Sequence, residues 1–225
     1  MYSAFVSIAL FGMLMQTLFI VVEHGEKYLL ADVLKGFASL AFVTIGFVGY
    51  NEYSNDSLGC KILIGLILGM LGDIVLNLRF VLKENGEKAF LGGIVLFWLG
   101  HVLYLAALIP LTDCLLVDVC VGLSLTAALL AYFYQTMKPK VVFKVLGAVY
   151  LGAVVGMTVI AVQLALTTIA TSYIVYAVGA LLFMISDIVL ICNTFGETSK
   201  FSLRILNLSC YYVGQLLIAG SLFLR

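Results

Sequence analysis

The sequence predicts an all-α membrane protein that crosses the bilayer eight times. Of its 225 residues, 64% are hydrophobic and 11% are charged, whereas soluble domains are about 45–50% apolar and about 25% charged. The apolar residues form runs of about 20, which is the length that one helical span needs. These runs lack the alternation of polar and apolar residues that marks the strands of a membrane barrel. A polytopic bundle of transmembrane helices is therefore the expected fold class.

The eight apolar runs take up most of the chain and leave only short connections between them. No room remains for a soluble domain, so we expect residues 1–225 to form a single transmembrane domain. The predicted spans are residues 3–22, 29–50, 58–79, 89–110, 114–135, 141–165, 169–193 and 201–224.

The positions of the Lys and Arg residues indicate how the spans are oriented, because cytoplasmic loops carry an excess of these cations. The other side holds only Lys61 and Arg225. The odd-numbered loops and their flanks hold the remaining ten, namely Lys27, Lys35, Arg79, Lys83, Lys88, Lys138, Lys140, Lys144, Lys200 and Arg204. We therefore expect a multi-pass protein with both termini outside the cytosol, in the cytoplasmic membrane if the source is bacterial.

The first two spans differ in their polar content. Residues 3–22 are mostly Phe, Leu, Ile and Met with a single glutamine, Gln16, which is typical of a packing helix. A basic segment before this span and a small-residue cleavage signal after it are both missing, so we expect it to be retained. Residues 29–50 carry Asp32 and Lys35 near the cytosolic boundary. Lys35 either extends its ammonium group to the interface or holds an anionic head group.

The third and seventh spans each contain an aspartate in the same local sequence. The motif Met-x-x-Asp-Ile-Val-Leu occurs at residues 70–76 and again at 184–190, and it places Asp73 and Asp187 inside apolar runs. A charge in the middle of the bilayer costs about 3 kcal/mol on insertion scales, so such residues are candidates for function by default. The sequence thus points to these two carboxyl groups as the centre of the protein.

Further polar side chains in the second, third, fourth, sixth, seventh and eighth spans are candidates to surround the aspartates or to contact the substrate. Asn77 lies one helical turn after Asp73, and His101 and Tyr104 share a face of the fourth span. The fifth span has no charge in its interior. The candidate supporting or substrate-binding residues are Lys35, Asn77, His101, Tyr104, Tyr150, Ser186, Asn193, Tyr211, Tyr212 and Gln215.

The two halves of the chain resemble each other. His101 follows Asp73 by 28 residues in a Gly-His-x-Leu sequence, and Gln215 follows Asp187 by 28 residues in a Gly-Gln-x-Leu sequence. This similarity predicts repeats of about residues 1–112 and 113–225. An offset of four spans makes them parallel repeats related by an axis along the membrane normal. Such symmetry places the two aspartates at equal depth, facing each other.

Two carboxyl groups that share a poorly solvated site cannot both ionise cheaply, so we expect them to hold about one proton between them. Such a pair offers an acid beside a base or a cation stabiliser. One interpretation is a lipid-processing enzyme, and the alternative is a proton-coupled transporter that uses the same pair. An intramembrane aspartyl protease fits less well, because it would need Gly-x-Gly-Asp, whereas the two glycines here, Gly69 and Gly72, are spaced by three.

Other classes of function find little support. The net charge is zero, so nothing suggests a nucleic-acid partner. The five cysteines show no CxxC or Cys/His spacing typical of a metal site, and no HExxH motif occurs. We expect no metal and no cofactor, and the oligomeric state is left open.

The chain resembles the YhhN-like membrane proteins, the lysoplasmalogenases, over nearly its whole length. The most specific parts are Leu71-Gly72-Asp73 with Leu76, Gly100-His101-Val102-Leu103-Tyr104, the run Gly179-Ala180-Leu181-Leu182-Phe183 through Ser186-Asp187, Leu190 and Phe195, and Tyr211-Tyr212-x-x-Gln215-Leu216-Leu217. Lys35 and Tyr150 match a lysine and a tyrosine of the family. Prolines often follow that lysine in the family, where Gly36 and Ala38 stand here, which affects the local shape of the second span.

The resemblance implies hydrolysis of the vinyl ether bond of a lysoplasmalogen, giving a fatty aldehyde and glycerophosphoethanolamine or glycerophosphocholine. It also implies that Asp73 and Asp187 are the catalytic pair, and that the partners are a lysophospholipid substrate and the lipid bilayer. Vinyl ethers hydrolyse by protonation at carbon through an oxocarbenium ion, and glycosidases handle the same kind of cation with two carboxyl groups. The hypothesis is that one aspartate is the acid and the other stabilises the cation, with Lys35 near the phosphate.

Overall fold

The computed structural model describes residues 2–137 and 139–225, so Lys138, one of the ten cations assigned to the cytosolic side, lies outside the described residues. Within the described chain there are eight α-helices long and apolar enough to span a membrane, which confirms the predicted class and span number. The helices are α1 (Tyr2–His24), α2 (Tyr28–Tyr53), α3 (Ser57–Asn77), α4 (Gly86–Leu108), α5 (Leu115–Thr136), α6 (Val141–Thr168), α7 (Thr171–Phe195) and α8 (Phe201–Ser221).

The helices begin and end within a few residues of the predicted spans, and local chemistry explains several of these ends. Asp56 caps α3, because its Oδ1 accepts a hydrogen bond of 2.7 Å from the amide of Gly59. At its other end α3 passes into a 3₁₀ turn, Leu78–Phe80. Pro139 lies in the connection before α6, where a residue without an amide hydrogen costs no helical hydrogen bond.

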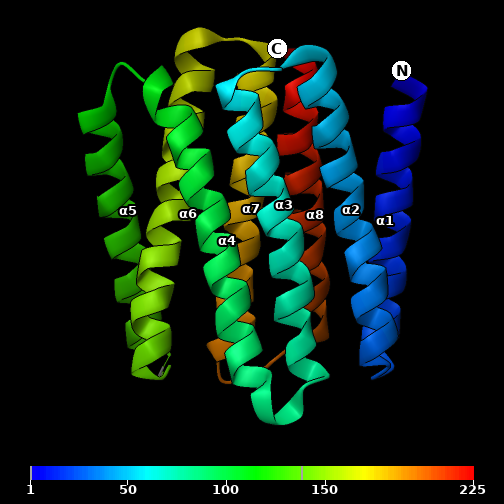
Figure 1. Ribbon diagram of the computed structural model, residues 1–225. Helices are drawn as coiled ribbons and strands as arrows, with labels where there is room; N and C mark the ends of the chain where they lie inside the picture. Colours follow the sequence, from blue (N-terminus) through cyan, green and yellow to red (C-terminus); the bar gives the residue numbers. More distant parts are fainter. Residues whose placement is uncertain (1, 138) are drawn as a thin grey trace.

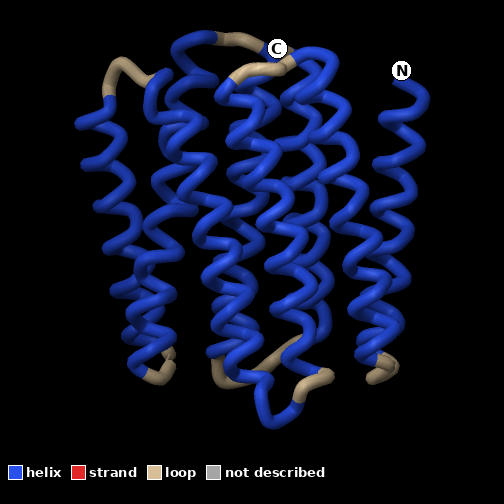
Figure 2. The backbone as a smooth tube through the Cα atoms, in the orientation of Figure 1, coloured by secondary structure: helices blue, strands red, loops and turns tan. Residues whose placement is uncertain are grey.

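Successive helices run up and down, so that both chain ends lie at one end of the bundle (Figure 1). Figure 2 shows that the loops and turns are confined to the two ends of the bundle. We call the end opposite the chain termini the distal end; of the described residues, it holds the connections at residues 25–27, 78–85, 137, 139–140 and 196–200. Helices α2, α3 and α4 form one layer and α6, α7 and α8 the other, with α1 and α5 at the outer edges.

Each neighbouring pair in the first half of the bundle has a counterpart in the second half. Helix α2 packs on α3 and α3 on α4, just as α6 packs on α7 and α7 on α8. The two layers meet where α4 contacts α6 and where α2 contacts α8. Helix α8 is the most buried span and α5 the least buried. Asn207, Tyr211, Tyr212 and Gln215 of α8 are thus buried inside the bundle, whereas most of the surface of α5 faces outward.

Glycines allow close contact at the tightest helix pairs. A Cβ atom at Gly100 of α4 would lie 3.1 Å from the carbonyl oxygen of Gly65 in α3. A Cβ atom at Gly179 of α7 would lie 2.8 Å from the carbonyl oxygen of Gly214 in α8. Small residues at these crossings let the backbones approach, which is how membrane helices commonly associate. The crossings fix the rotation of α3 and α7, and with it the direction in which each aspartate points.

Candidate active site

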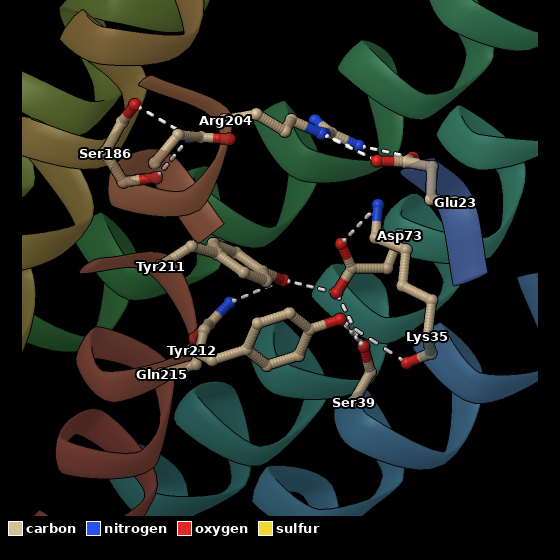
Figure 3. A network of polar contacts seen from close by, with 10 residues as sticks. Glu23, Lys35, Ser39, Asp73, Ser186, Arg204, Tyr211, Tyr212 and Gln215 are labelled. Atoms are coloured by element: carbon tan, nitrogen blue, oxygen red, sulfur yellow. Dashed lines mark hydrogen bonds and ion pairs between the residues drawn. The ribbon is translucent and has the colours of Figure 1, made fainter. Parts of the chain in front are cut away.

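Asp73 is held in the bundle interior by groups from α2 and α8. Its Oδ1 lies 3.1 Å from the ammonium nitrogen of Lys35. Its Oδ2 accepts hydrogen bonds of 2.6 Å from the hydroxyls of Ser39 and Tyr211 (Figure 3). Both oxygens therefore have partners, and the positive charge of Lys35 balances the negative charge of an ionised Asp73.

Lys35 is 3% exposed and does not reach the interface, so the interpretation in which its ammonium group extends to the membrane surface is wrong. Ser39 lies one helical turn beyond Lys35 in α2, which is why both side chains reach the same carboxylate. Behind them, the hydroxyl of Tyr212 lies 3.3 Å from Ser39 Oγ and donates to the carbonyl oxygen of Lys35 at 3.4 Å. The Asp73 side of the site is thus a hydrogen-bonded cluster around one ion pair.

Asp187 is also buried, but its surroundings differ. The hydroxyl of Tyr150 in α6 donates a hydrogen bond of 2.6 Å to Asp187 Oδ2. Among the described residues no Lys, Arg or His forms an ion pair with Asp187, and no donor bonds to its Oδ1. Burial without a counter-charge is costly for a carboxylate and much less so for a neutral carboxylic acid. The two aspartates therefore differ in their balance of charge.

Ser186 and Asn207 join α7 to α8 beside Asp187. The amide nitrogen of Asn207 donates to both the carbonyl oxygen and the hydroxyl oxygen of Ser186, each at 2.8 Å. These two hydrogen bonds hold the first half of α8, which contains Asn207, against α7. Ser186 thereby supports the site through Asn207, and its hydroxyl makes no described hydrogen bond to Asp187.

One cavity of about 100 Å³ is bordered by both aspartates. Its other polar neighbours are Lys35, Tyr150, Ser186, Thr194, Arg204, Asn207 and Tyr211. The rest of the wall is mostly apolar and aromatic, formed by Leu76, Phe90, Ile94, Phe97, Phe143, Phe183, Leu190, Ile191, Phe195 and Leu208. Sites that enclose a whole ligand are commonly about 300–1,000 Å³, so this cavity is too small to enclose a ligand of that size completely. It brings two carboxyl groups from α3 and α7 into one apolar chamber.

Other predicted residues form a layer behind the cavity wall. Gln215 donates to the hydroxyl of Tyr211 at 3.4 Å and accepts from the hydroxyl of Tyr104 at 3.4 Å. His101 Nδ1 lies 2.8 Å from the carbonyl oxygen of Phe97, and its Nε2 has no partner among the described residues. These side chains are buried and act on the site through Tyr211 and through packing.

Two predicted residues lie away from the cavity. Asn77 is fully buried and does not line the cavity; its side chain faces Asp32 of α2 rather than Asp73 or Asp187. Asn193 lies at the distal end of α7, where its Oδ1 accepts a hydrogen bond of 2.7 Å from the amide of Lys200. It organises the turn between α7 and α8.

Sequence reasoning missed Ser39, Asn207 and the pair of Glu23 with Arg204. Ser39 lies four residues after Lys35, and Asn207 lies four residues before Tyr211, so helical spacing alone was an available signal for both. Arg204 donates to Glu23 through Nε at 3.0 Å and Nη2 at 2.7 Å (Figure 3). No local pattern links residues so far apart in the sequence.

The fold and the site define a class of protein: a multi-pass membrane protein in which two buried carboxyl groups border one apolar chamber. The chain belongs to the YhhN family, whose model matches residues 30–222. This confirms the resemblance found in the sequence. No curated protein and no solved structure matches the chain.

Proposed function

We propose that this protein is a membrane-embedded hydrolase that cleaves the vinyl ether bond of lysoplasmalogens. Membership of the YhhN family, which includes lysoplasmalogenases, supports the proposal. The observation that carries it is the unequal pair at the cavity: Asp73 has the counter-ion Lys35, and Asp187 has the neutral donor Tyr150. The reaction needs both an acid and a lasting negative charge at one apolar site, and this pair offers them.

In the proposed reaction Asp187 is the acid. Because Tyr150 bonds to Oδ2, the proton of Asp187 is carried on Oδ1, where no described donor competes. Asp187 transfers this proton to the β-carbon of the vinyl ether, and the double bond becomes an oxocarbenium ion. Asp187, now ionised, and Asp73 both place negative charge near that cation, as paired carboxyl groups do in glycosidases.

Water completes the reaction. It adds to the cationic carbon, and the proton that it loses returns to Asp187, which restores the acid. The resulting hemiacetal collapses to a fatty aldehyde and the free glycerol hydroxyl of the glycerophospho head group. In this collapse the hemiacetal hydroxyl loses a proton and the leaving glycerol oxygen gains one. Ser39, Tyr211 and Lys35 hold the carboxyl group of Asp73 in place at the edge of the cavity.

The direct test is aldehyde release from a lysoplasmalogen by the purified protein. Asp187→Asn should abolish it, because a general acid contributes about 10²–10⁴ in rate. Asp73→Asn alone leaves the ammonium group of Lys35 without its counter-ion. The role of Asp73 is therefore tested with the double variant Lys35→Met/Asp73→Asn, which removes both charges. This variant should also be inactive. If Asp187→Asn and the double variant keep full activity while remaining folded, the pair is structural.

The same test separates the enzyme from the proton-coupled transporter. A carrier that used this pair would move a solute across sealed vesicles and release no aldehyde. A screen of ether and ester lysolipids identifies the substrate, since family membership specifies it poorly.

We further propose that the two halves are parallel repeats. The matching helix contacts of α2–α4 and α6–α8 support this, as do the two glycine crossings. The pairs Gly65 and Gly179, Gly100 and Gly214, and Asp73 and Asp187 share one interval of 114 residues. The difference between Asp73 and Asp187 would then be a specialisation of two originally equivalent positions.

We propose that the distal end faces the cytosol. The Lys and Arg residues of its connections support this orientation. Both aspartates lie in the distal halves of their helices, so the site would open toward the cytosolic leaflet. Single cysteines introduced at residues 25–27 or at residues 54–56 test this orientation in intact cells. A membrane-impermeant thiol reagent applied outside should label only the cysteines at residues 54–56.

A further inference from the structure

A second hollow adjoins the aspartate cavity at the distal end of the bundle. It has a volume of about 430 Å³ and lies among the 3₁₀ turn after α3, the end of α7 and the start of α8. Leu190, Thr194, Arg204 and Asn207 border both hollows. A molecule that occupied both would have one end beside the aspartates and the other at the distal surface. We call this second hollow the distal cleft.

Cations dominate the charge of the distal cleft. Arg79, Lys200 and Arg204 line it, together with the neutral side chains of Asn193 and Ser199. Among the described residues no carboxylate lines the cleft. It is therefore a cationic surface at the mouth of an otherwise apolar chamber.

These cations differ in whether their charge is balanced. Arg204 forms a two-point ion pair with Glu23, through distances of 3.0 and 2.7 Å. Arg79 and Lys200 form no ion pair with any carboxylate of the described chain. The positive charges of Arg79 and Lys200 thus have no counter-charge in the described chain, and an anionic ligand in the cleft would supply one.

Arg79 is held in place although it has no ion pair. Its guanidinium carbon lies 4.6 Å from the centres of both the Phe80 and the Phe90 rings. Its Nε atom is buried and has no hydrogen-bond partner among the described residues. Contact with these two rings restricts the guanidinium group, which lowers the entropy cost of binding an anion. Arginine presented in this way suits the paired oxygens of a phosphate.

The turn before α8 positions Lys200, the second cation of the distal cleft without an ion pair. Asn193 Oδ1 accepts from the amide of Lys200 and from the hydroxyl of Ser199, at 2.7 and 3.5 Å. Lys200 is the N-cap residue of α8, so the positive end of the helix dipole adds to its charge. Its own side chain is exposed and free to move toward a ligand.

We propose that the distal cleft binds the phosphate of a lysophospholipid through Arg79 and Lys200, and that the glycerol backbone then leads the ether bond to Asp187. This inference rests on the proposed function for the part that concerns the ether bond. It also reassigns the phosphate contact expected at Lys35, because Lys35 is engaged by Asp73. The apolar tail extends from the chamber toward lipid, and the charged product is released at the distal surface.

The test uses binding rather than turnover, so that it is independent of catalysis. The probes are a lysophospholipid with a saturated ether chain, which keeps the phosphate but cannot react, and the matching alkylglycerol without phosphate. The detergent-solubilised protein should bind the phosphate-bearing probe at least about ten-fold more tightly than the alkylglycerol. Arg79→Gln and Lys200→Gln should each reduce that preference, and the double variant should remove it.

Lys140→Gln is the matched control. Lys140 is an exposed lysine at the same end, and its ammonium group pairs with Glu87 at 2.8 Å outside the cleft. It should leave the preference unchanged. Because Lys200 is exposed, Lys200→Gln should fold even if Arg79→Gln does not.

The outcomes are distinct. Equal binding of the two probes by the wild-type protein, or a preference in the Lys200→Gln variant as large as that of the wild type, overturns the proposal. Displacement of the phosphate-bearing probe by an equal concentration of inorganic phosphate or glycerophosphate would mean that the cleft binds soluble anions. That result would also overturn the proposal. A preference that depends on Arg79 and Lys200 without any aldehyde release from a lysoplasmalogen would leave the cleft assigned and refute the hydrolase.

Discussion

Lys35 and Asp73 form an ion pair inside the bundle, with 3.1 Å between Nζ and Oδ1 and only 3% of each side chain exposed. Asp187 borders the same cavity, and its described hydrogen bond comes from the neutral hydroxyl of Tyr150. The cavity therefore contains one carboxylate with a counter-charge and one carboxyl group without one in the described chain. In the proposed reaction this difference assigns the role of acid to Asp187 and that of the charged partner to Asp73.

Removing the cation of the pair should destabilise the protein. Lys35→Met leaves Asp73 buried without a counter-charge, and breaking a buried pair in this way costs about 3–5 kcal/mol. The double variant Lys35→Met/Asp73→Asn removes both charges and should recover most of the loss. Thermal unfolding of the detergent-solubilised variants measures this. A double variant no more stable than Lys35→Met would show that the ion pair does not set the stability of the site.

Tyr150→Phe should slow the reaction without unfolding the protein. It removes the hydroxyl that orients Asp187, and we expect kcat to fall about ten-fold, as for loss of one hydrogen bond to a group that becomes charged. Tyr176→Phe is the control, because the Tyr176 hydroxyl is buried without a described partner. Equal kinetics of the two variants would mean that Tyr150 has no role in orienting the acid.

A larger residue at position 147 should close the chamber. Gly147 of α6 borders the cavity, and a Cβ atom there would meet nothing within 4 Å. Gly147→Leu should therefore fit in the helix yet take the space of the substrate, raising KM by about ten-fold or more as a few kcal/mol of binding are lost. Val149→Leu, at a 51% exposed position of the same helix, should behave like the wild type. An unchanged KM for Gly147→Leu would place the substrate elsewhere.

The cap of α3 should make a small, pH-dependent contribution to stability. The guanidinium group of Arg225, with the amide of Gly59, holds the pKa of Asp56 below its ordinary value. Because the folded-state pKa is lowered, this stabilisation is present above the ordinary pKa of about 4 and is lost as the pH falls below it. Asp56→Ala should cost about 1 kcal/mol at neutral pH, and Asp56→Asn, which keeps a cap, should cost less. Unfolding curves at pH 7 and pH 3.5 test this, and an Asp56→Ala variant with an unchanged pH dependence would refute it.

Hydropathy was sufficient to predict the helices, because a helical span must satisfy its own backbone hydrogen bonds and be apolar over its length. The high cost of charge in a membrane also made Asp73 and Asp187 stand out. The spans and the two aspartates can both be recognised from the order of apolar and charged residues along the sequence. This recognition needs no knowledge of which helix packs on which.

The partners of the aspartates depend on packing and were harder to predict. Ser39 is a small hydroxyl residue in an apolar helix, and it matters only because α2 turns that face toward α3. The same holds for Lys35, whose sequence neighbourhood does not reveal whether it meets water, lipid or Asp73. The helix rotations that decide this are set by close crossings such as that of Gly179 and Gly214, and these cannot be read from composition.

The most direct test of the central claim, that Asp187 protonates the carbon of the vinyl ether, is hydrolysis of a lysoplasmalogen in D₂O by the purified protein. The aldehyde is trapped as it forms and analysed by mass spectrometry. The account predicts one deuterium on the carbon next to the carbonyl group for the wild type, and no aldehyde above background for Asp187→Asn. Aldehyde without deuterium, or release by Asp187→Asn at the wild-type rate, would contradict it.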